Sequence, residues 1–122
     1  MLKIYLSGAI TGREAEAKKE FAEAEKSIKN SLIDYGFQKH EFKIKNPFKI
    51  LKLNKKHKYE DYLRADIKVL CDCDYLVNIR NEGWEKSKGA KLEKQIAKAL
   101  NIPNLLYISQ IKKKKIRKNR YK

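Results

Sequence analysis

The sequence predicts an α/β domain built on a parallel sheet, and three observations support this prediction. Short apolar runs typical of strands alternate with longer segments whose apolar residues recur every three or four positions. The third of the strand-like runs is apolar throughout its centre, as strands buried in parallel sheets are. The chain has 122 residues and no internal repeat, which is enough for one domain with a single core.

Four segments have the pattern of strands. The first alternates apolar and polar residues and ends at Gly8, which indicates a strand that meets a glycine turn. The second ends at the Asn46-Pro47 pair, which breaks regular structure. The four predicted strands cover residues 2–7, 41–47, 74–80 and 104–109.

Three helices are predicted between these strands. The first has apolar residues spaced by three or four from Ala17 to Tyr35, the second covers 59–70, and the third begins at Lys88. The basic, irregular segment 48–58 is expected to be a loop. We therefore predict a single-domain, three-layer α/β fold of the flavodoxin/Rossmann-like type, with a mainly parallel sheet of four to five strands and ligands bound at the carboxyl ends of the strands.

The net charge of +15 is unevenly distributed along the chain. Eight Lys and Arg residues and no acid lie in 112–122, so this segment holds about half of the excess. We expect residues 1–109 to form the α/β domain and residues 110–122 to form a basic, flexible C-terminal tail. The tail suits a non-specific contact with nucleic acid, but a solubilising role is favoured.

No apolar run approaches the length of a membrane-spanning helix, and Met1 is followed by a predicted strand instead of a signal peptide. A cytoplasmic protein without membrane association is therefore expected. Cys71 and Cys73 are too close for an ordinary disulfide, and C-x-C supplies only half of a structural zinc site. Both are predicted to be reduced packing residues, and no metal or other cofactor is expected.

Two carboxylates occupy positions that the helical patterns would assign to apolar residues. Glu93 lies three residues after Ala90, and Asp66 lies four residues after Tyr62, so each shares an apolar face. An unpaired carboxylate away from water costs several kcal/mol or shifts its pKa. Either acid alone fits a hydrogen-bonded cap equally well, whereas the two together, near the ligand-binding edge of a parallel sheet, favour a functional site.

Ser87 and Gly89 suggest an anion site at the start of the third helix. Ser87 is a good N-cap, Gly89 lets a ligand approach the first turn, and the N–H groups there suit a phosphate. The pattern alone is weak, because many helices begin this way without a ligand. Trp84, in the preceding loop, is expected either to stack on a base or to shield the loop.

Three motifs, taken together, carry a family resemblance. They are IYLSGAITG at 4–12, LRADIKVLCDCDYLVNI at 63–79 and GWEKSKGAKLEKQIA at 83–97. In this order they resemble the nucleoside 2-deoxyribosyltransferase-like superfamily, and within it a small bacterial and phage branch similar to 2′-deoxynucleoside 5′-phosphate N-hydrolases. The resemblance covers nearly the whole chain up to Ser109, and the segment after Ile111 lies outside it.

The resemblance implies a role for each matching residue. Glu93 matches a nucleophile that attacks C1′ of a deoxyribosyl group and displaces the base, by the logic of retaining glycosidases. Asp66 matches a carboxylate that assists the leaving base or the sugar hydroxyl, and Tyr5 matches a tyrosine that holds the nucleophile in place. The predicted substrate-binding residues are Ser7, Gly8, Ala9, Thr11, Asn46, Pro47, Trp84, Ser87 and Gly89.

The resemblance also implies the substrate. Serine at the position of Ser87 is typical of members that hydrolyse deoxynucleoside 5′-monophosphates, whereas members that transfer the sugar to another base have an acid there. Those hydrolases carry an arginine where this chain has Thr11, and Arg13 lies close by but displaced. Because members share sites between subunits, a homodimer or larger homo-oligomer is expected.

The leading prediction is therefore an enzyme that cleaves the N-glycosidic bond of a 2′-deoxynucleoside 5′-monophosphate, with a small-molecule nucleoside or nucleotide as its partner. A nucleoside 2-deoxyribosyltransferase and a catalytically silent nucleotide-binding module are the alternatives. A nucleic-acid-binding protein that acts through the basic tail is least favoured, because no recognition-helix signature occurs in the sequence.

Overall fold

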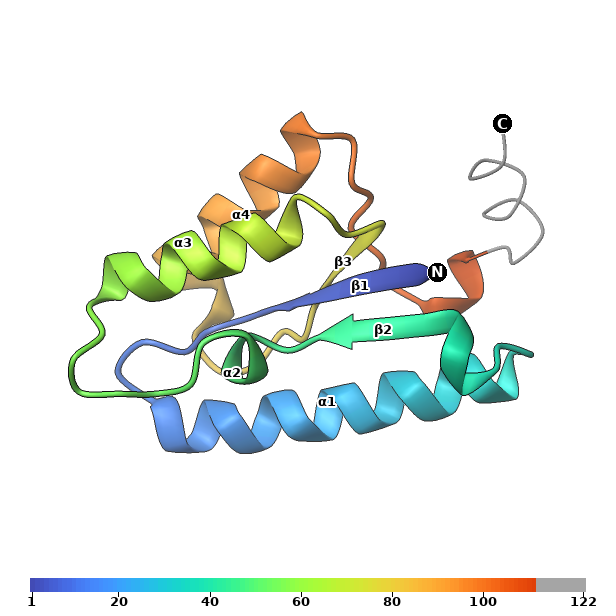
Figure 1. Cartoon of the computed structure of the whole chain (residues 1–122), viewed down its shortest axis with the longest axis horizontal. Coiled ribbons are helices and arrows are strands. Elements are labelled where there is room, and N and C mark those ends of the chain that lie inside the picture. Colours follow the sequence, from blue (N-terminus) through green and yellow to red (C-terminus); the bar gives the residue numbers. More distant parts are fainter. Residues whose placement is uncertain (112–122) are drawn as a thin grey trace.

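The computed structural model describes residues 1–111 (Figure 1). Its centre is a three-stranded, all-parallel sheet in the order β2-β1-β3, with one long helix along one face and two helices over the other (Figure 1). This arrangement confirms the predicted α/β class and parallel sheet. The strands are β1 (Leu2–Ser7), β2 (Phe42–Lys45) and β3 (Tyr75–Asn78), and the covering helices are α1 (Glu14–Asp34), α3 (Tyr59–Leu70) and α4 (Lys88–Ala99).

The central strand β1 is buried on both faces. Its alternate residues Leu2, Ile4 and Leu6 pack with the apolar side of α1 in one core cluster. Tyr5 points to the opposite face, where a second cluster contains Leu70 of α3. Because side chains of a strand alternate between the faces of a sheet, the odd-numbered positions of β1 face α3 and α4.

The helices begin and end near the positions that the sequence predicts. Helix α3 covers the predicted segment, and α4 begins at Lys88 because the Ser87 hydroxyl accepts the backbone N–H of Ala90 at 3.2 Å. Helix α1 ends before Gly36, whose φ of 103° is accessible to glycine at little cost. Apolar periodicity was therefore a reliable guide to these three helices.

The predicted fourth strand at 104–109 is wrong, and the sheet has three strands where four to five were expected. Asn104 makes a single parallel bridge to Leu76. Beyond it, the Gln110 side chain accepts the backbone N–H groups of Leu106 and Tyr107 at 2.8 and 3.0 Å. These bonds occupy donors that a strand would use, and the chain turns into the short helix η3 (Ile108–Gln110).

The predicted loop 48–58 contains a short helix at its start, α2 (Pro47–Ile50). The Asn46 side chain accepts the backbone N–H of Phe48 at 3.0 Å, and Pro47 occupies the first helical position, where its missing N–H costs nothing. The remaining short elements are the 3-10 helices η1 (Lys39–Glu41) and η2 (Trp84–Lys86).

The two cysteines differ in their surroundings. Cys73 is buried, and its thiol donates to the backbone carbonyl of Val69 at 3.3 Å. Cys71 is exposed, because it caps α3 at the point where the chain leaves the helix, so its predicted packing role is wrong. Neither cysteine forms a disulfide.

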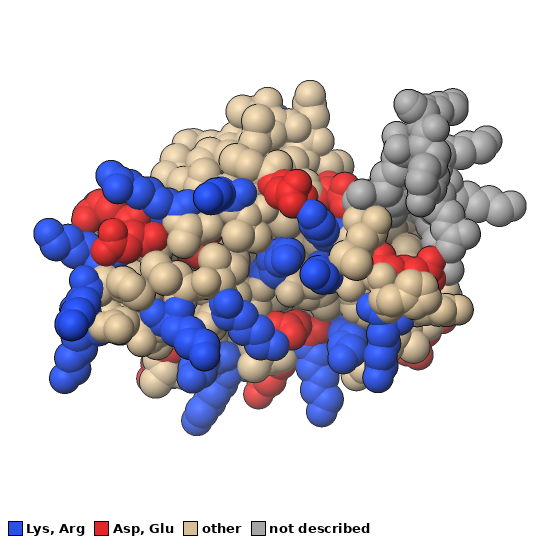
Figure 2. Space-filling view, in the orientation of Figure 1, with Lys and Arg blue, Asp and Glu red and all other residues tan. Residues whose placement is uncertain are grey.

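Lys and Arg side chains are spread over the visible face of the molecule (Figure 2), with acidic side chains between them. The predictions for the basic tail concern 112–122, which lie outside the described residues. Within residues 1–111, no helix combines the length and the apolar character needed to span a bilayer.

Ile111 belongs to the core cluster between β1 and α1 and is fully buried. Ile111→Ala is therefore expected to lower the free energy of unfolding by about 2–5 kcal/mol, because it removes apolar contacts and leaves a cavity. Ile33→Ala, at a position of α1 that is 39% exposed, is the matched control and should change it by at most about 0.5 kcal/mol. Urea denaturation measures both, and equal effects would contradict the burial of Ile111.

Candidate functional site

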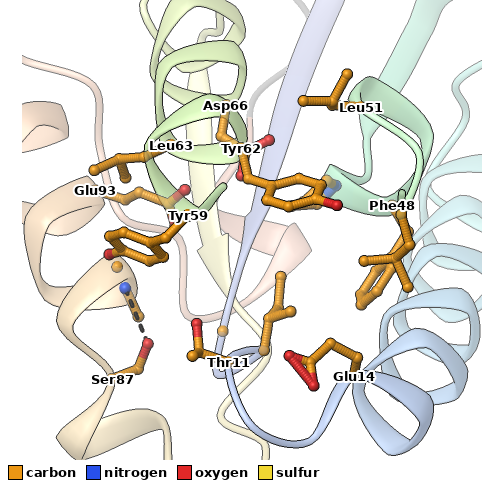
Figure 3. Close-up of a pocket in the computed structure, with 16 residues that line it drawn as sticks. Thr11, Glu14, Phe48, Leu51, Tyr59, Tyr62, Leu63, Asp66, Ser87 and Glu93 are labelled. Atoms are coloured by element: carbon orange, nitrogen blue, oxygen red, sulfur yellow. Dashed lines mark hydrogen bonds between the residues drawn. The ribbon is translucent and has the colours of Figure 1, made fainter. Parts of the chain in front are cut away.

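A cavity of about 230 Å³ lies at the carboxyl end of β1, on the side of the sheet covered by α3 and α4. Figure 3 shows Glu93 and Ser87 on one side of it, Phe48 and Leu51 on the other, and Thr11 and Glu14 across from α3. This is the edge of the sheet at which the sequence analysis expected a ligand. The lining residues are Gly8, Ile10, Thr11, Glu14, Pro47, Phe48, Leu51, Leu53, Tyr59, Tyr62, Leu63, Asp66, Ser87, Gly89, Ala90 and Glu93.

Glu93 is held at the floor of this cavity by two hydroxyl groups. The Tyr5 hydroxyl donates to its Oε2 at 2.5 Å, and the Ser7 hydroxyl donates to its Oε1 at 2.7 Å. The residue is only 6% exposed. Each carboxylate oxygen therefore has a fixed donor, while the same group borders the cavity.

The two donors come from β1 because of the alternation along this strand. Tyr5 and Ser7 are two residues apart, so their side chains leave the sheet on the same face, toward α4. Ala90 and Ala97, on the same side of α4 as Glu93, are buried, and such small residues let the helix approach the sheet closely. The unexpected acid in the apolar face of α4 is thus explained by two hydroxyl partners on the neighbouring strand.

Burial raises the pKa of Glu93 to about 7, while the hydrogen bonds from Tyr5 and Ser7 act in the opposite direction. Burial and the neighbouring Glu93 charge also raise the pKa of the Tyr5 hydroxyl well above its ordinary value. Tyr5 therefore keeps its proton and remains a donor to Glu93 throughout the neutral range.

Asp66 lines the same cavity from α3, and burial followed by the charge of Glu93 raises its pKa to about 8. Two hydrogen bonds favour the ionised form of Glu93, and none of residues 1–111 donates one to Asp66. Near neutral pH the pair therefore holds its proton on Asp66 and its negative charge on Glu93. A nucleophilic or basic carboxylate beside a proton-donating carboxyl is a common catalytic arrangement.

The first turn, which forms part of the cavity wall, is clamped by Asn81, a residue that the sequence analysis missed. The side chain of Asn81 accepts the backbone N–H of Ala9 and donates to its carbonyl, both at 2.8 Å, and also donates to Glu20 at 2.9 Å. A Cβ on Gly8 would lie 2.9 Å from the Asn81 Oδ1 and 2.8 Å from a side-chain carbon of Ile79. Only glycine fits this close approach.

Tyr59, Tyr62 and Leu63 form the wall on the α3 side, and the sequence analysis assigned this face of α3 to the core. The Tyr62 hydroxyl accepts the backbone N–H of Asn54 at 2.9 Å, which ties the segment before α3 to the wall. The signal for this wall was present in the sequence. Asp66 shares the face with Tyr62, so a face that borders a cavity at Asp66 borders it at Tyr62 as well.

The remaining predicted binding residues divide into two groups. Gly8, Thr11, Pro47, Ser87 and Gly89 line the cavity, whereas Ala9, Asn46 and Trp84 do not. Ala9 is held by Asn81, Asn46 caps α2, and Trp84 lies in a different cleft. Arg13 does not reach the cavity wall, because its guanidinium forms an ion pair with Glu20.

The cavity wall is acidic. Glu14, Asp66 and Glu93 line it, and none of the described lining residues is a Lys or Arg. No group of three His, Cys, Asp or Glu side chains suited to a metal ion occurs within the described part of the chain. What the wall offers to a ligand is thus a pair of carboxyl groups, two tyrosines and apolar surface.

Comparison with known proteins gives one family match. Residues 2–106 match the family described as "Domain of unknown function (DUF4406)". No curated protein and no solved structure matches the chain.

Replacement of Asp66 by Asn is expected to stabilise the protein at pH 8 by about 2 kcal/mol. The folded protein keeps the Asp66 proton up to about pH 8, while the unfolded chain releases it near 3.8, so the stability of the parent falls as the pH rises between these values. Asn carries no charge and avoids this loss. Urea denaturation of both proteins at pH 4 and pH 8 measures the effect.

The matched control is Glu60→Gln, which removes a carboxylate from an exposed position of the same helix. It should leave the difference in unfolding free energy between pH 4 and pH 8 unchanged. If Asp66→Asn shifts stability by the same amount at both pH values, the proton on Asp66 is not the cause.

Proposed function

This chain belongs to the DUF4406 family, and from that premise we propose that it cleaves the N-glycosidic bond of a 2′-deoxynucleoside. The observation that carries the proposal is Glu93, a carboxylate held by Tyr5 and Ser7 at the floor of a cavity that Asp66 also lines. The resemblance of the three sequence motifs to nucleoside 2-deoxyribosyltransferase-like proteins supports the same chemistry.

In the first step, an oxygen of the ionised Glu93 attacks C1′ of the sugar. The bond between C1′ and the base nitrogen breaks, its electron pair stays with the base, and Asp66 transfers its proton to the base. The product is a free base and a sugar joined to Glu93 through an ester. Asp66 is now ionised and Glu93 is uncharged, so the total charge of the site has not changed.

In the second step, water attacks C1′ and Asp66 takes up one of its protons, as microscopic reversibility requires. The ester bond breaks and returns its electron pair to Glu93. Both carboxyl groups regain their starting states, and the free sugar leaves. If a second base attacks in place of water, the same intermediate leads to transfer of the sugar, which is the alternative reaction of this site.

Tyr5 and Ser7 act by holding the nucleophile. Both donate to Glu93, and both are fully buried behind it. They fix the direction of the attacking oxygen and stabilise the ionised form of the carboxylate. Tyr59, Tyr62 and Phe48 offer ring surface against which a base can pack.

The charge of the wall favours a substrate with a free 5′-hydroxyl. A phosphate in this cavity would meet Glu14, Asp66 and Glu93 without a described cation to offset them. The 5′-monophosphate is the second candidate, and the observation that supports it is the start of α4. There Ser87 and Gly89 both line the cavity, and the first turn of the helix presents backbone N–H groups to it.

Glu93→Gln is expected to lower the rate of base release by about 10³-fold or more, because an amide cannot attack C1′. The measurement is chromatographic detection of free base from a panel of deoxynucleosides and their 5′-monophosphates, with and without an acceptor base. Glu85→Gln, at an exposed position of η2 outside the cavity, is the matched control and should retain the parent rate.

The panel also separates the alternatives. Equal base release by the parent and the Glu93→Gln variant would overturn the proposal. A nucleoside that binds tightly and is recovered intact would favour a silent binding module. Base exchange only in the presence of an acceptor would assign transfer in place of hydrolysis.

The rate of base release is expected to follow a bell-shaped pH profile with limbs near pH 7 and pH 8. Below about 7 Glu93 becomes protonated and cannot attack, and above about 8 Asp66 loses the proton that the leaving base needs. Asp66→Asn should remove the alkaline limb and lower kcat by about 10²-fold or more. An alkaline limb that persists in this variant would exclude Asp66 as the proton donor.

A further inference from the structure

A second cleft, also of about 230 Å³, lies between the end of β3, η2 and α4, and Trp84 lines it. The catalytic proposal assigns no role to this tryptophan. Arg80 and Lys94 line the same cleft, and so do the amide side chains of Asn78 and Asn104. The cleft therefore combines a flat aromatic surface with two cations and two groups that both donate and accept hydrogen bonds.

The charge of this cleft is opposite to that of the first cavity. The first is lined by three carboxylates and by no described cation, while the second is lined by Arg80 and Lys94 and by no described carboxylate. Both cations are exposed, so their charges are accessible to a ligand. Of the two hollows, the second is the one that attracts an anion.

The backbone around this cleft is held in a demanding conformation. Arg80 has a φ of 51°, in the left-handed region that residues with a Cβ seldom adopt, and the Asn78 side chain accepts its backbone N–H at 2.8 Å. Such conformations cluster at functional sites. Trp84 follows Gly83, whose φ is 82°, and its backbone N–H donates to the carbonyl of Asn81 at 3.1 Å. Arg80 and Trp84 are thus both placed by specific hydrogen bonds.

We propose that this cleft is a second ligand site, which binds a free nucleoside monophosphate with its base stacked on Trp84 and its phosphate bound by Arg80 and Lys94. Tryptophan offers the largest ring surface for a base, and guanidinium and ammonium groups are the usual phosphate partners. Asn78 and Asn104 can bond the edge of the base or the sugar hydroxyls. The proposal does not depend on the activity of the first cavity.

The test uses Trp84 as its own probe, because it is the one tryptophan in the chain. Full-length protein carrying Glu93→Gln, in which no bond cleavage is expected, is titrated with AMP while its tryptophan fluorescence is followed. AMP should quench the fluorescence in a saturable manner, and adenosine, ribose 5-phosphate and inorganic phosphate should each need at least about tenfold higher concentrations. Equal potency of adenosine and AMP, or no saturable quenching, would overturn the proposal.

Charge variants locate the phosphate. Lys94→Ala and Arg80→Asn should each weaken AMP binding about tenfold, since each removes a charge-assisted bond. Asparagine is chosen at position 80 because it tolerates a positive φ. The matched control is Lys91→Ala, which removes a lysine that is exposed on the same helix and does not line the cleft. An equal loss with Lys91→Ala would indicate diffuse attraction to the basic surface and would overturn the proposal.

Two further arms separate other origins of the signal. Gly89→Leu places a side chain in the first cavity and should leave the quenching by AMP unchanged, whereas its loss would place the ligand in that cavity and contradict the second site. A short single-stranded oligodeoxynucleotide tests for nucleic acid. If it quenches while AMP does not, the cleft binds a strand and not a free nucleotide.

Discussion

The buried hydrogen bonds from Tyr5 and Ser7 to Glu93 are the constraint on which the site depends. A carboxylate with 6% exposure needs donors inside the protein, because it loses most of its hydration. The donors stand two residues apart on the central strand, so the face of β1 that carries them must turn toward α4. The opposite face of the same strand then supplies the core against α1. One strand thus serves packing on one side and chemistry on the other.

Asp66 shows how the same low-hydration environment produces two different carboxyl groups. Glu93 has two hydroxyl donors that favour its charge, while Asp66 lies in the same cavity beside that charge, so its pKa rises to about 8. Burial disfavours both charges, and the hydrogen bonds decide which group keeps its proton. The stability that the folded protein gives up at this pair is of the kind that functional sites commonly hold.

The distribution of charge around β3 and α4 separates two environments that are neighbours in the chain. Glu93 and Lys94 are consecutive residues, yet one lines the acidic cavity and the other lines the basic cleft that contains Trp84. A helix directs successive side chains about 100° apart, so adjacent positions can serve different surfaces. The loop from Arg80 to Ser87 lies between the two hollows and supplies residues to both.

The sequence by itself determined the α/β class, the three long helices, the parallel strands β1, β2 and β3, and the placement of Glu93 and Asp66 in apolar helix faces, because periodicity and breakers are local properties. Only the tertiary structure decided that 104–109 makes a single bridge, since side-chain bonds from Gln110 compete with strand pairing. It also decided that Tyr62 borders a cavity, that Asn81 clamps the first turn and that Trp84 lies in another cleft. Those facts depend on which distant segments face each other, and no local pattern in the chain contains that information.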